Sequence, residues 1–107
     1  MEHTSPLESN TSKIELLIEI LLDPNARDDE KDDAVIELGN YPNKKVEEVL
    51  LLVSNDPSFD EMIRASCGES LAEIWVKQSK LDISKLKSLT GIALQEALSL
   101  FQNKRPD

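Results

Sequence analysis

The sequence predicts an all-α domain, and two observations lead to this fold class. Apolar residues recur at intervals of three and four along most of the chain, and no run alternates between apolar and polar residues as a half-buried strand would. With only three Gly and five Pro, the chain also lacks the turn formers that a β-sandwich requires. In 107 residues that are 39% hydrophobic and 4% aromatic, we expect one domain with an aliphatic core.

The segment Phe59–Lys77 is predicted to be the central helix. Its apolar residues recur every three or four positions and share one face, namely Phe59, Ile63, Cys67, Leu71 and Ile74. Ser58 and Glu61 have the spacing of a capping box at its start. Gly68 costs about 1 kcal/mol relative to alanine within a helix, so we expect it to permit close packing of a neighbouring helix.

A first helix is predicted to start at Ser12, where Ser12 and Glu15 match a second capping box, and to end at Asp23-Pro24. Its apolar residues cover more than one stripe, which requires that most of its surface be covered. The polar stretch Asn25–Asp33 then leads into a second helix.

We expect the second helix to end at Gly39 in the left-handed conformation. Asn43 is predicted to cap a third helix, which ends at the turn Ser54–Pro57. A fifth helix follows, with Asp82 or Ser84 as its cap and a possible break at Thr90-Gly91 that starts a second piece near Thr90. The stripe of this helix comprises Leu86, Leu89, Ala93, Ala97 and Leu100. The predicted domain spans residues 12–103, between flexible tails at 1–11 and 104–107.

The stretch around the central helix resembles the first helix of a HEAT-like repeat of the PBS-lyase type. The matching positions are Asp56, Pro57, Ile63, Arg64, Ala65 and Leu71. A shift of 33 residues also places Lys31–Gly39 loosely over Arg64–Ala72. The resemblance covers about residues 28–90. For the whole domain it implies about five helices stacked as a small, irregular α-α superhelix that binds proteins. It further implies a structural bond from Arg64 to an aspartate, for which Asp60 is within reach.

The net charge of −9 is concentrated in the first half of the chain. Residues 1–61 contain 16 acidic and 5 basic side chains, a net charge of −11, whereas residues 62–107 contain 5 and 7, a net charge of +2. Such a charge repels nucleic acids and anionic lipids and attracts basic proteins. Solubility alone is the simpler explanation of the same charge.

No set of residues typical of an enzyme or a cofactor site is found in the sequence. There is no phosphate-binding glycine loop, no zinc spacing of Cys and His, and no EF-hand pattern in Asp23–Asp33. His3 is the only histidine and falls in the predicted tail, while Cys67 falls on an apolar stripe and is expected to be a core residue. Trp75 is expected in the core in preference to a surface anchor. We therefore predict neither catalysis nor a cofactor nor a metal.

We expect a non-enzymatic, protein-binding module, and specifically a small acidic inhibitor of the immunity or antitoxin kind that neutralises a basic toxin such as a nuclease. The predicted contact residues are Asp28, Asp29, Glu30, Asp32, Asp33, Glu37, Glu47 and Glu48. An adaptor or scaffold subunit of a larger assembly is the alternative. A third interpretation, a HEAT-like subunit of a bilin lyase, requires a longer array or a partner subunit.

We expect a cytoplasmic location. The first ten residues have neither the basic nor the apolar segment of a signal peptide. One cysteine excludes an intramolecular disulfide, and no apolar run is long enough to span a bilayer. The expected partner is therefore a basic protein, and neither nucleic acid nor a membrane.

Overall fold

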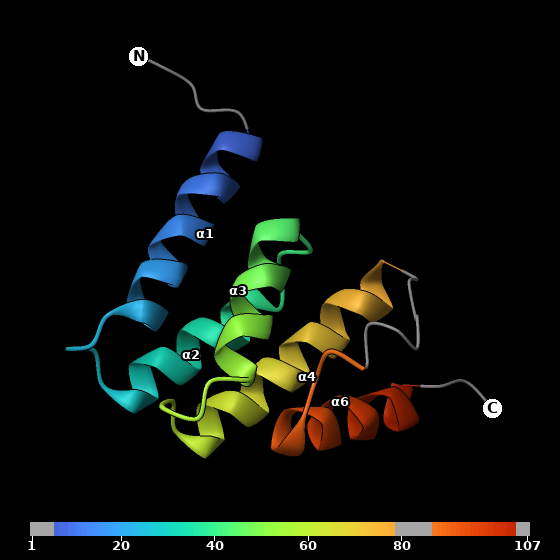
Figure 1. The fold of residues 1–107 in the computed structure, drawn as a ribbon. Helices are drawn as coiled ribbons and strands as arrows, with labels where there is room; N and C mark the ends of the chain where they lie inside the picture. The colour runs from blue at the N-terminus through green and yellow to red at the C-terminus, as the bar shows by residue number, and fades with distance from the viewer. Residues whose placement is uncertain (1–5, 79–86, 105–107) are drawn as a thin grey trace, which may run out of the picture.

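The computed structural model describes residues 6–78 and 87–104, which form five α-helices and contain no strand (Figure 1). The helices are α1 (Pro6–Leu22), α2 (Asp28–Leu38), α3 (Lys44–Ser54), α4 (Glu61–Lys77) and α6 (Gly91–Lys104). The predicted all-α class is confirmed. None of these helices is both long enough and apolar enough to cross a membrane.

Helix α4 lies at the centre of the helices, as predicted. It packs against α2 on one side and α6 on the other, and α3 also packs against it. Helix α1 packs mainly on α2 and touches α3 only slightly. Two rows of helices result, with α1 and α3 in one row and α2, α4 and α6 in the other. Helix α1 is therefore an edge helix, with a large part of its surface unpartnered.

The core is aliphatic apart from one aromatic residue, Trp75, which is 1% exposed. Every described helix contributes fully buried side chains to it, among them Leu21, Val35, Leu38, Val46, Leu50, Ile63, Leu71, Ala93 and Ala97. The predicted core positions of Trp75 and Cys67 are confirmed. Helix α1 contributes Ile14, Ile18 and Leu21, but Leu16 and Leu22 are more than half exposed, so the cover expected for this helix is incomplete.

Helix α1 begins at Pro6, six residues before the predicted start at Ser12. Ser12 therefore lies inside the helix and caps nothing, and residues 6–11, predicted as tail, are helical. Proline is compatible with the first helical position because its ring fixes φ near the helical value and its missing N–H has no partner there anyway. His3 lies outside the described residues.

The predicted capping box of Ser58 and Glu61 is wrong. The backbone N–H and hydroxyl of Ser58 both donate to Asp56 Oδ1, at 2.9 and 2.8 Å, and Asp60 caps α4 by accepting from the Met62 N–H at 2.9 Å. The helix starts at Glu61, so Phe59 precedes it, although its ring still packs against the core.

The expected bond between Arg64 and Asp60 does not form. Arg64 Nε instead donates to the carbonyl oxygen of Phe59 at 3.1 Å. Asp60 is engaged as the helix cap, which holds its carboxylate against the start of α4. The guanidinium therefore stabilises the turn before α4 through a backbone acceptor.

Gly68 permits the close helix contact that the sequence predicts. A Cβ atom at this position would lie 2.6 and 2.7 Å from the carbonyl carbon and Cα of Ala93 in α6. Gly39, by contrast, ends α2 with φ −61°, so the expected left-handed cap is wrong. Its lack of a side chain instead leaves room for Ser70, which donates to the Val35 carbonyl at 2.9 Å and ties α4 to α2.

The sequence leaves open whether the fifth helix is continuous across Thr90-Gly91, and in the structure residues 87–90 are not helical. Gly91 has φ +56°, a conformation that glycine tolerates best, and α6 starts there. Asn55 holds the preceding turn, because its side chain donates to the Ser88 carbonyl and accepts from the Thr90 hydroxyl. The predicted caps Asp82 and Ser84, and Leu86, lie outside the described residues. Helix α6 runs to Lys104, one residue into the predicted tail.

Candidate functional site

A groove runs between the edge helix α1 and helix α2. We define this α1–α2 groove, of about 600 Å³, by its lining residues: Lys13, Leu17, Ile20, Asp23, Asn25, Ala26, Glu30, Asp33, Ala34 and Glu37. Lys13, Leu17 and Ile20 recur at four and three residues on α1, and the α2 residues recur at three, one and three. Both walls are therefore single faces of regular helices.

The acidic wall of the groove starts in the first turn of α2, directly after Arg27. Asp28, Asp29 and Glu30 form the first turn of α2, where a helix favours negative charge. Glu30 Oε1 also accepts from the Arg27 N–H at 3.0 Å, which fixes its side chain at the start of the helix. The polar stretch predicted for Asn25–Asp33 is therefore too long, because its last six residues already belong to α2.

At the other end of the groove, Lys13 Nζ lies 3.5 Å from Glu37 Oε2. Both side chains are about half exposed, so this ion pair contributes little to stability. A hydrogen bond with Tyr41 and the charge of Glu37 raise the pKa of Lys13. The pair shows that a cation can lie beside Glu37 at this end of the groove.

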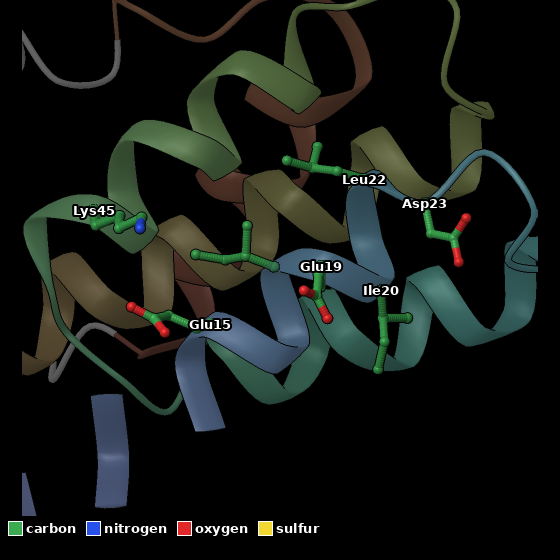
Figure 2. A pocket seen from close by; sticks show the side chains of 7 residues that line it. Glu15, Glu19, Ile20, Leu22, Asp23 and Lys45 are labelled. Carbon is green, nitrogen blue, oxygen red and sulfur yellow. The ribbon is translucent and has the colours of Figure 1, made fainter. Parts of the chain in front are cut away.

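A second depression lies on the other flank of α1 (Figure 2). This α1–α3 depression, of about 640 Å³, is lined by Glu15, Ile18, Glu19, Ile20, Leu22, Asp23 and Lys45. Figure 2 shows Glu15 and Glu19 on α1 and Lys45 on α3, on facing sides of it. Ile20 and Asp23 line both depressions, so the two share the outer surface of α1.

Three of the eight predicted contact residues, Glu30, Asp33 and Glu37, come together in the α1–α2 groove. Asp28 lines a different, smaller depression with Leu22 and Phe59. Asp29 pairs with Arg27 Nε at 3.2 Å on the exposed surface. The predicted acidic segment is thus divided among several surfaces, because successive residues of a helix point in different directions.

Asp32 points toward α4, where its charge acts on the Cys67 thiol. Its Oδ1 atom is buried and has no hydrogen-bond partner. Burial, and to a smaller extent the charge of Asp32, raise the pKa of Cys67 to about 12. The cysteine is therefore a protonated core residue at neutral pH, which excludes a reactive thiolate at this position.

The two predicted contact residues of α3 lie away from the groove. Glu47 accepts from the indole N–H of Trp75 at 3.0 Å, so its carboxylate serves the core contact between α3 and α4. Glu48 lines a depression on α3 with Leu52 and Pro57. Neither residue joins the carboxylates of α2.

Three carboxylates near the groove, Glu15, Glu19 and Asp23, were not among the predicted contact residues. Their spacing of four residues places them in one row along α1. The sequence carries this signal, but the predicted acidic surface was confined to the denser runs in α2 and α3.

Among residues 6–78 and 87–104, no three His, Cys, Asp or Glu side chains are grouped so that they could hold a metal ion. Asp56 accepts from the N–H and hydroxyl of Ser58, and these bonds lower its pKa. Its role is to shape the turn before α4.

Comparison with protein-family models, with curated proteins and with solved structures finds no match for this chain.

Proposed function

We propose that this chain is a non-enzymatic protein-binding module, a small acidic inhibitor of the immunity or antitoxin kind that binds and neutralises a basic toxin such as a nuclease. The site of binding is the outer surface of α1 with the acidic face of α2. We further propose a cytoplasmic location, in keeping with a single free, buried cysteine.

The observation that supports this proposal is the charge around α1. Six carboxylates line the α1–α2 groove and the α1–α3 depression, whereas only Lys13 and Lys45 bring positive charge. Leu16, which is 56% exposed, projects from the same helix. An exposed apolar side chain beside several carboxylates complements a basic protein surface, and the negative charge of the carboxylates steers such a partner toward α1. A nuclease presents a basic surface because it binds phosphates.

We also propose that the chain is related to HEAT-like repeats. The two-row packing supports this relationship, as does the equivalence of α2 and α4 at the 33-residue shift. Leu38 and Leu71 are both fully buried, and Lys31 and Arg64 both contact Phe59, the first by lying 5.4 Å from the centre of its ring. Stacked helices of this kind provide extended surfaces for binding proteins.

The test is a pull-down from a lysate of the source cell at low and high salt, with the bound proteins identified by mass spectrometry. The proposal expects one small basic protein that is lost as the salt concentration rises. That protein should be toxic when expressed alone and harmless when expressed with this chain. A salt-resistant complex with larger subunits contradicts the inhibitor.

The adaptor alternative is favoured by a different surface, on α3. Leu52 is 72% exposed beside a depression that Leu51 and Pro57 also line. An exposed apolar patch of this kind is typical of a protein interface. If the chain is an adaptor, Leu52→Ser should abolish capture of the larger subunits, and the acidic residues of α1 and α2 should not affect it.

A further inference from the structure

The two walls of the α1–α2 groove differ in chemistry. Leu17 and Ile20 make the middle of the α1 wall apolar, between Lys13 and Asp23, and both are partly buried. On the α2 wall, Glu30, Asp33 and Glu37 present carboxylates along about two helical turns. Ala34, which is buried at 2% exposure, keeps the space between the walls free of a large side chain.

We propose that the partner protein places a basic amphipathic helix in this groove. Lys or Arg residues of that helix, three or four positions apart, lie against Glu30, Asp33 and Glu37. Its Leu or Ile residues, on the adjacent stripe, lie against Leu17 and Ile20. This inference rests on the proposed function, because it specifies how the basic partner is recognised.

A helix fits this groove better than an extended peptide does. Both walls are helices whose backbone groups are bonded within each helix, so the groove offers no edge to which a strand could add. The acidic residues also repeat with the spacing of a helix face, which a parallel basic helix matches. A second copy of this chain is disfavoured, because it brings the same net charge of −9 to an acidic wall.

Lys13 already holds the position that a partner cation would take. Its ammonium group lies 3.5 Å from Glu37 and also bonds Tyr41, and 55% of its side chain is exposed, so a partner cation can displace it into solvent by replacing these contacts. A partner Lys or Arg must compete with it for Glu37. Removal of Lys13 should therefore strengthen binding, whereas neutralisation of the α2 carboxylates should weaken it.

The probe is a synthetic helical peptide of Leu and Lys, about four turns long, with the lysines on one face. Its binding to the full chain is followed by NMR amide shifts and by titration. We expect the largest shifts along α1 and α2. Lys13→Ala should tighten binding up to about fivefold, and D33N/E37Q should weaken it about threefold to thirtyfold.

Two controls separate groove binding from general attraction between opposite charges. The variant E61Q/E69Q removes the same two charges from exposed positions of α4 and should bind the peptide like the wild type. A peptide of Ser and Lys with the same charge should bind much more weakly, because it lacks the apolar stripe. Shifts centred on α3 or α6, or equal binding of both peptides, overturn the inference.

The cellular partner distinguishes this inference from the proposed function. If the wild type and D33N/E37Q capture the same basic partner equally, the α1–α2 groove is not the binding surface, but the proposed inhibitor function still stands. Peptide binding in the groove supports the proposal that the groove binds a basic helix. If the captured cellular partner is nevertheless acidic, or its complex resists salt, the proposed inhibitor function is contradicted.

Discussion

The contact between Trp75 and Glu47 shows that a carboxylate in an acidic run can have a structural role. The indole is 1% exposed, and its N–H donates to Glu47 at 3.0 Å, which joins α4 to α3. A carboxylate engaged in this way is a poor choice for binding a partner, although the sequence places it in an acidic run.

Glu47→Ala should therefore lower stability more than it lowers partner binding. Removal of the acceptor from a buried indole N–H costs about 1–3 kcal/mol. Glu48→Ala, one residue further on and exposed, is the matched control and should change the free energy of unfolding by less than about 0.5 kcal/mol. Equal denaturant midpoints for the two variants would contradict the structural role of Glu47.

Cys67 links burial to pH. Its thiol is fully buried, and the pKa is raised to about 12 from 9.0. Between these two pKa values the thiol of the unfolded chain loses its proton, whereas the buried thiol of the native chain remains protonated. Stability is therefore lost between the two pKa values. At mildly alkaline pH a thiol reagent should react with the unfolded chain at once and with the native chain only through rare opening.

At the scale of elements, the contact of α4 with α6 depends on the absence of a side chain. Gly68→Ala would gain about 1 kcal/mol in helix propensity but would place a Cβ against the Ala93 backbone, which cannot rotate away. Overpacking costs about 1–3 kcal/mol, so we expect a net loss. Glu69→Ala, on the exposed side of the same helix, should be close to neutral by thermal unfolding. A Gly68→Ala protein as stable as the wild type would show that the helices can separate without cost.

Helix α1 is held by one stripe of residues. Leu21 is fully buried and Leu22 is 52% exposed, so the same change at adjacent positions separates docking from helix propensity. Leu21→Ala should cost about 2–5 kcal/mol, and Leu22→Ala less than about 0.5 kcal/mol. Chemical denaturation of both variants measures the difference, and similar costs would contradict the docking of α1 by this stripe.

Strong local patterns predict the helices and the core, but not the ends of the helices. The stripe of α4 and the cap at Asn43 follow from spacing and residue type. The start of α4 does not, because Ser58, Asp60 and Glu61 are all competent cap formers and only the turn at Asp56 decides between them. The start of α1 was missed because its first residues lack an apolar period.

The candidate site could be predicted only in part. An acidic run in the sequence identifies the carboxylates, but it does not predict which of them lie on the same surface. Glu30, Asp33 and Glu37 meet apolar residues of α1 only because α1 packs on α2, which is a tertiary contact. The same contact brings the row of Glu15, Glu19 and Asp23 on α1 close to the carboxylates of α2.

At the scale of the whole molecule, charge and exposed apolar surface coincide on one edge. Helix α1 closes one end of the two rows, and nothing within the described chain covers its outer face. The proposed inhibitor uses this edge, whereas the adaptor would use Leu52 on α3. The two proposals therefore differ in which surface a partner protects.

The most direct test of the proposed binding surface is a quantitative pull-down from the source lysate with three proteins: wild type, D33N/E37Q and E61Q/E69Q. The two variants differ from the wild type by the same charge. If the α1–α2 groove binds a basic partner, D33N/E37Q should lose most of it at moderate salt and E61Q/E69Q should retain it. Equal losses from both variants would show that only net charge matters, and no loss from either would contradict the groove as the binding surface.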